Sequence, residues 1–149
     1  MFAGIRWTRV LAAAVASEVG VVAILLSVIA VYSAVIAPGM SDAEYQTLGE
    51  RVGYYVAPTA GFVTTALMVL WAGRKLDSNF VANGLMVGVV SVVITSPFFF
   101  TAEPGDRLMY GAAFVLRLAA GYIGGMLAQK RFTGTMSQRE LQIEDRRLN

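Results

Sequence analysis

Four long runs of apolar residues dominate this sequence and restrict the folds open to it. They lie at residues 10–37, 54–72, 80–100 and 108–127. A hydrocarbon core about 30 Å thick is crossed by about 20 helical residues, and each run has about that length or more. Only 15% of the residues are charged, against roughly 25% in a soluble domain. The sequence therefore predicts an all-α integral membrane protein, a four-helix bundle whose main partner is the lipid bilayer.

The first run raises the question of a cleaved signal peptide. Arg6 and Arg9 precede it, as basic residues precede the apolar part of such a peptide. That apolar part has about 7–15 residues, whereas this run has 28 and contains Glu18. We therefore expect a retained helix that ends at Pro38 and Gly39.

Basic residues are distributed unequally over the two sides of such a bundle. One side carries nine: Arg6, Arg9, Arg74, Lys75, Lys130, Arg131, Arg139, Arg146 and Arg147. The other side carries two, Arg51 and Arg107. Because Lys and Arg accumulate on the cytoplasmic side of membrane proteins, both termini are predicted to be cytoplasmic. The net charge of +2 then follows from topology and does not indicate a nucleic-acid partner.

The chain divides into a membrane domain, residues 1–131, and a polar cytoplasmic tail, residues 132–149. Ser137 and Glu140 in the tail have the spacing of a capping box, in which each side chain satisfies a backbone N–H of the other. A short cytoplasmic helix and a disordered segment are both compatible with this tail.

The connection between the first and second spans contains residues that predict a helix start. The segment 38–53 contains Ser41 and Glu44, again at capping-box spacing. This spacing predicts a short helix at the membrane interface before the second span. Pro58 is expected in the first turns of that span, where a missing N–H is tolerated.

Two ionisable residues lie inside the predicted spans, Glu18 in the first and Arg117 in the fourth. At 1.5 Å per residue, Glu18 lies about 14 Å and Arg117 about 17 Å from the cytoplasmic border, so the two side chains are able to meet. A charge at this depth is costly unless it faces protein or water and has a partner. Either Glu18 is a coupling site for protons or cations, or the two residues form an ion pair that locks the bundle.

Glycines recur at helical spacing in the last two spans. Gly84 and Gly88 form one GxxxG pattern, and Gly121 and Gly125, with Gly124 beside them, form another. Small residues at this spacing let helix backbones approach closely. The patterns indicate tight packing, either against another subunit or within the chain.

Several chemistries are excluded by composition. The chain has no Cys and no His, so it lacks thiolate and imidazole metal ligands and the usual nucleophile–base pairs. No Asp lies inside a span. The sequence therefore indicates no catalytic residue, metal or cofactor, and we do not expect an enzyme.

The hairpin between the second and third spans resembles one in known proteins. Residues 72–75, Ala-Gly-Arg-Lys, followed by residues 83–88, Asn-Gly-Leu-Met-Val-Gly, are similar to the central hairpin of uncharacterised four-helix bacterial membrane proteins. Those families carry a Gly-rich stretch like residues 120–125 in their last helix. This resemblance implies a four-span fold in the bacterial inner membrane, with no assigned activity.

The first span has a separate, local resemblance. Residues 16–20, Ala-Ser-Glu-Val-Gly, resemble the first helix of small multidrug-resistance transporters. In that family a glutamate exchanges protons for cationic drugs, which would make Glu18 the coupling residue. The present chain departs from the family in its long segment 38–53 and in Arg117.

Together these observations predict a multi-pass, non-enzymatic protein of the bacterial inner membrane. Its expected role is that of a structural or assembly subunit, associated with itself or with other membrane subunits. The alternative is a small proton- or cation-coupled transporter or channel that uses Glu18.

Overall fold

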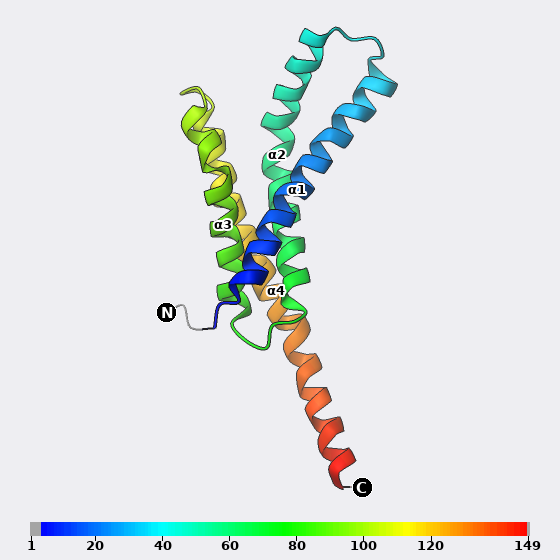
Figure 1. Ribbon diagram of the computed structural model, residues 1–149, viewed down its shortest axis with the longest axis vertical. Coiled ribbons are helices and arrows are strands. Elements are labelled where there is room, and N and C mark those ends of the chain that lie inside the picture. Colours follow the sequence, from blue (N-terminus) through cyan, green and yellow to red (C-terminus); the bar gives the residue numbers. More distant parts are fainter. Residues whose placement is uncertain (1–3, 149) are drawn as a thin grey trace.

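Helices form all the regular structure of the part of the chain that is described, as the apolar runs predict. The computed structural model describes the backbone of residues 4–148 and the side chains of residues 4–133. The helices are α1 (Trp7–Val31), α2 (Asp42–Gly73), α3 (Phe80–Thr101) and α4 (Arg107–Leu148). A short π-helix, η1 (Tyr32–Ile36), continues α1 (Figure 1). Four helical stretches are long and apolar enough to cross a membrane: residues 7–36, 42–73, 80–101 and 107–133.

Helix α2 begins earlier than its apolar run. The backbone N–H of Ser41 donates to Glu44 Oε2 at 2.7 Å, and Asp42 is the first helical residue. The predicted interfacial helix is therefore the beginning of α2, and no break separates it from the span. Consequently Pro58 lies well inside α2, and the prediction that it occupies the first turns is wrong.

Helix α4 ends later than its apolar run. It continues without interruption to Leu148, so residues 132–148 extend the fourth helix. The prediction of a separate short helix or a disordered segment is wrong for the backbone. The side chains of Ser137 and Glu140 lie outside the described residues. The fourth helix leaves the bundle because the polar tail carries no apolar run to pack (Figure 1).

The four helices pack closely at one end of the molecule and diverge at the other (Figure 1). We name the first the closed end; it contains the start of α1, the α2–α3 connection and the point where α4 leaves the bundle. At the opposite end, the splayed end, α1 and α2 form one arm and α3 and α4 the other. Helices α1 and α4 each pack chiefly on α2 and α3, so they lie across the bundle from each other.

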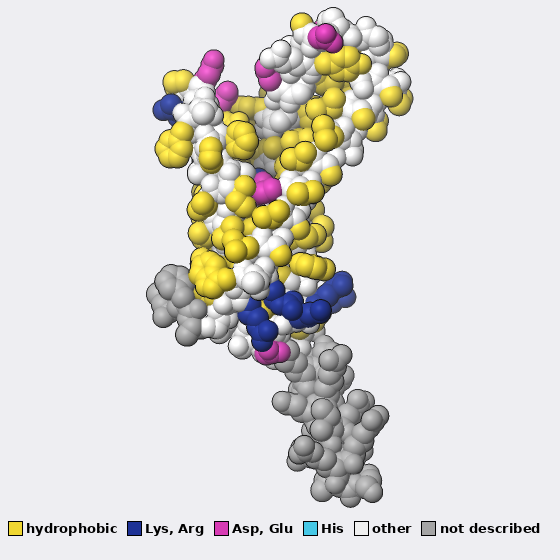
Figure 2. Space-filling view, in the orientation of Figure 1, with side chains coloured by type: hydrophobic (Ala, Val, Ile, Leu, Met, Phe, Trp, Pro, Cys, Tyr) yellow, Lys and Arg dark blue, Asp and Glu magenta, His cyan; other side chains and the backbone are white. Residues whose placement is uncertain are grey.

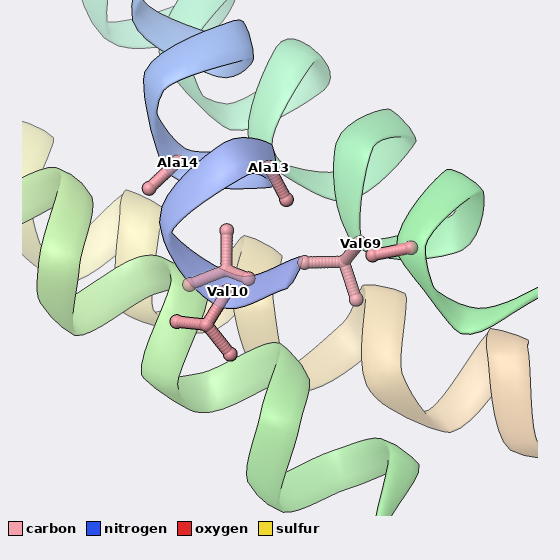
Figure 3. Packing of buried hydrophobic residues seen from close by; sticks show 6 residues of the cluster. Val10, Ala13, Ala14 and Val69 are labelled. Carbon is pink, nitrogen blue, oxygen red and sulfur yellow. The ribbon is translucent and has the colours of Figure 1, made fainter. Parts of the chain in front are cut away.

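Small apolar side chains fill the core at the closed end. Val10, Ala13 and Ala14 of α1 meet Val69 of α2, and all four are at most 3% exposed (Figure 3). A second cluster joins Leu76 to α3 and α4. The close approach of the helices follows from these small side chains, because bulkier ones would hold the backbones apart.

Charges are segregated along the bundle. Lys and Arg side chains gather at the closed end, and acidic side chains are concentrated at the splayed end (Figure 2). Between the two lies a broad hydrophobic surface (Figure 2). This pattern agrees with a helix bundle that contacts lipid along its middle and water at its two ends.

Candidate functional site

Arg117 crosses the middle of the bundle. It projects from α4 and is only 6% exposed. Two glycines on neighbouring helices leave space for this residue. A Cβ at Gly61 of α2 would lie 3.3 Å from the guanidinium nitrogens Nε and Nη2, and one at Gly88 of α3 would lie 2.7 Å from the Arg117 carbonyl oxygen. The guanidinium therefore lies against bare backbone, which a larger residue at position 61 would obstruct.

The guanidinium of Arg117 reaches Glu18 of α1. Nη1 donates a hydrogen bond to Glu18 Oε1, and the two groups form an ion pair. The side chain of Arg117 is 8% exposed and that of Glu18 is 18% exposed. The contact expected from the similar depths of the two residues in the sequence is therefore present in the structure. The pair links helices that share few other contacts, because α1 and α4 lie across the bundle from each other.

A cluster of hydroxyl groups lies beside the ion pair. Ser17 Oγ lies 3.1 Å from Thr64 Oγ1 and 3.0 Å from Thr65 Oγ1. Thr64 also donates to the Ala60 carbonyl oxygen at 2.8 Å. All three hydroxyl residues are buried, and they join α1 to α2. Sequence analysis missed this cluster, and the signal available was the position of Ser17 next to Glu18.

One buried hydroxyl group in the same region has no partner. Ser91 of α3 is fully buried, and its Oγ makes no hydrogen bond to the described part of the chain. It lies one helical turn beyond Gly88, the residue against which Arg117 packs. Thr95 donates to the Ser91 carbonyl oxygen at 2.9 Å. We name Ser17, Glu18, Thr64, Thr65, Ser91 and Arg117 the polar layer.

The glycine patterns are used inside the chain. A Cβ at Gly84 would collide with the Gly121 carbonyl oxygen and lie 3.0 Å from Gly125 Cα. A Cβ at Gly124 would lie 3.0 Å from Val69 Cβ of α2. Of the two alternatives left open by the sequence, the structure shows packing within the chain. A contact with another subunit has to use other surfaces.

The polar layer has a restricted chemistry. Within the described residues, no three His, Cys, Asp or Glu side chains lie close enough together to hold a metal ion. Its charged groups neutralise each other, and its hydroxyl groups bond mainly to one another and to backbone carbonyl oxygens. Such an arrangement joins helices by polar contacts inside an apolar bundle.

An open groove lies away from this layer, at the splayed end. It has a volume of about 330 Å³, and Tyr32 of η1 and Met40, Glu44, Leu48 and Arg51 line part of it. It contains both an acidic and a basic side chain, so it has no net preference for either sign of charge. It is lined by residues of η1, of the connection that follows it and of α2, so it belongs to one arm.

Comparisons of the whole chain with protein-family models, with curated protein sequences and with solved structures give no significant match.

Proposed function

We propose that this protein is a non-enzymatic, multi-pass protein of the bacterial inner membrane, with four spans and both termini in the cytoplasm. Two features support this placement. The four apolar helices are long enough to cross a bilayer, and Lys and Arg side chains of the described residues gather at the closed end, where α1 begins and α4 leaves the bundle. The choice of the bacterial inner membrane follows the resemblance expected from the sequence of the α2–α3 hairpin.

Within that membrane we assign the protein the role of an assembly subunit, associated with copies of itself or with other membrane subunits. The carrying observation is the divergence of the two arms at the splayed end (Figure 1). Only 6% of the most apolar stretch of α1 is buried, against 39% for α2. Leu26 and Val35 on this helix and its extension are 61% and 74% exposed. In a bilayer these surfaces are covered by lipid or by another helix.

The polar layer supports the same role. Glu18 and Arg117 are paired, so each charge lowers the cost of placing the other inside the membrane. The pair and the neighbouring hydroxyl cluster fix the closed half of the bundle. A rigid closed half with separated arms is suited to holding a partner between or beside the arms.

Purification in mild detergent followed by native mass measurement tests this role. The expected result is a complex of fixed stoichiometry, either a homo-oligomer or a complex with a second membrane protein. Because the chain has no Cys, Leu26→Cys introduces a single thiol on the splayed half of α1. We expect this thiol to cross-link to a neighbouring subunit in native membranes.

The matched control is Leu11→Cys, which places a thiol on the same helix near the closed end at similar exposure, 50% against 61%. It is expected to cross-link much less. A monomer in mild detergent, together with equal cross-linking at the two positions, would contradict the assembly role.

A second candidate function is proton- or cation-coupled transport through Glu18. It is favoured by the 18% exposure of the Glu18 side chain, which leaves the carboxylate within reach of the surface. The pairing with Arg117 opposes it, because a neutralised carboxylate attracts a cationic substrate weakly. Release of protons on adding candidate cations to purified protein, lost in Glu18→Gln, would contradict a purely structural role for Glu18 and favour the transport function.

A further inference from the structure

Basic side chains from three separate parts of the chain converge at the closed end (Figure 2). We name them the basic collar; they are Arg6, Arg9, Arg74, Lys75, Lys130 and Arg131. Two observations fix the convergence. A Cβ at Gly73 would lie 2.7 Å from Ala128 Cβ, which brings the end of α2 against α4. Arg9 of α1 lines the same small hollow, of about 10 Å³, as these two residues.

The collar carries a large excess of positive charge. Asp77 is the acidic residue of the α2–α3 connection, and its Oδ2 accepts a hydrogen bond from Arg6 Nη2 at 2.7 Å. That pair leaves the charges of Arg74, Lys75 and Lys130 without an acidic partner in the described part of the chain. The sequence of the tail, residues 134–149, contains three basic and three acidic residues, so its net charge does not offset the excess.

The collar lies directly beside the surface that faces lipid. Trp7 and Trp71 are 45% and 51% exposed at the closed end, and tryptophan concentrates at the level of lipid headgroups. Leu11 and Leu127, one turn or so further into the apolar band, are 50% and 47% exposed. A lipid whose headgroup reached the collar at this level would have its acyl chains beside that apolar surface.

We propose that the basic collar is a binding site for the phosphate headgroup of an anionic phospholipid. The guanidinium of Arg74 and the ammonium groups of Lys75 and Lys130 supply the attraction. Arg9 lines the small hollow that Gly73 and Ala128, near these residues in the chain, also line. This inference requires the membrane insertion proposed above but is independent of the assembly role. Near a membrane surface each Lys or Arg contributes about 1 kcal/mol to such binding, so removal of three charges weakens it about a hundredfold.

The test measures the thermal unfolding midpoint of the full chain in a neutral detergent while phospholipid is added. The probes are dioleoyl phosphatidylglycerol, dioleoyl phosphatidylcholine with the same acyl chains, and inorganic phosphate. The collar variant is Arg74→Gln/Lys75→Gln/Lys130→Gln, whose three positions are all exposed. The matched control, Arg139→Gln/Arg146→Gln/Arg147→Gln, removes the same charge from the tail. A third variant, Arg74→Lys/Lys75→Arg/Lys130→Arg, retains the charge.

We expect phosphatidylglycerol to raise the midpoint of the wild type, the tail control and the charge-retaining variant, with half-maximal effect at similar concentrations. The collar variant is expected to need about a hundred times more lipid. Phosphatidylcholine and inorganic phosphate are expected to have little effect. A collar variant that responds like the wild type would overturn the proposal, as would equal responses to the two lipids. An equal response to inorganic phosphate would reassign the site to a free anion.

Discussion

Glu18 and Arg117 illustrate how a pair of buried charges is retained in an apolar bundle. Each charge alone is expensive in a membrane interior, and each is tolerated because the other is within hydrogen-bonding distance. Breaking a buried pair by removing one partner costs more than removing both, because the remaining charge then has no partner. The pair therefore predicts strong coupling between substitutions at the two positions.

We expect Glu18→Gln and Arg117→Gln each to destabilise the protein by on the order of 3 kcal/mol. The double variant is expected to be less destabilised than the sum of the two. Unfolding in detergent, followed by circular dichroism, measures these differences. Glu50→Gln, at an exposed position of the splayed end, is the control and should change stability little. Additive effects of the two substitutions would show that the pair makes no net contribution.

Gly61 determines whether Arg117 can reach its partner. An added methyl group would lie 3.3 Å from the guanidinium, closer than ordinary contacts, so Gly61→Ala should displace the side chain from Glu18. The expected loss is about 1–3 kcal/mol. Gly53→Ala on the same helix is the matched control, since a Cβ there meets nothing within 4 Å. It should stabilise α2 by about 0.5–1 kcal/mol, and equal effects of the two substitutions would contradict this account.

Sequence reasoning located part of the polar layer. The depths of Glu18 and Arg117 in the bundle can be estimated by counting residues along regular helices, which needs only the sequence. The hydroxyl cluster of Ser17, Thr64 and Thr65 depends on the rotation of α1 against α2. Ser and Thr are also common inside membrane helices, where they bond to their own backbone, as Thr64 does to Ala60. The residue types alone do not show whether a Ser or Thr hydroxyl bonds to its own helix backbone or to a neighbouring helix.

The ends of the helices were less predictable than their existence. An apolar run indicates which part of a helix can contact lipid. The helix itself ends where its backbone N–H and C=O groups find other hydrogen-bond partners, so the two boundaries can differ. Helix α2 begins at Asp42 because Ser41 and Glu44 satisfy its first N–H groups. The capping spacing was visible in the sequence, but the absence of a break before the span was not. Helix α4 likewise continues beyond its apolar run to Leu148.

The contact between α3 and α4 depends on glycine at one crossing point. Gly84 lies against the Gly121 carbonyl oxygen, which is backbone and has little freedom to move away. We expect Gly84→Ala to force α3 and α4 apart and to lower stability by about 1–3 kcal/mol. Thermal unfolding in detergent measures the change. Gly111→Ala on α4, where a Cβ meets nothing within 4 Å, is the control, and a harmless Gly84→Ala would refute the packing argument.

The molecule as a whole combines a fixed closed end with two separated arms. The small-residue core, the polar layer and the glycine crossing all hold the closed half together. In the splayed half the two arms diverge (Figure 1), and apolar side chains such as Leu26 and Val35 are exposed. The sequence predicted four helices because their apolar runs are long. It did not predict the divergence, because the exposed and buried faces of these helices are both apolar.

In the proposed topology, four helices cross a bilayer and both termini lie on the cytoplasmic side. Single cysteines in this cysteine-free chain test it most directly, with a membrane-impermeant maleimide applied to spheroplasts. Gly105→Cys, at the splayed end, is predicted to react with intact spheroplasts. Ser78→Cys and Thr133→Cys, at the closed end, are predicted to react only after lysis. Reaction of Gly105→Cys and Thr133→Cys from the same side would contradict this topology.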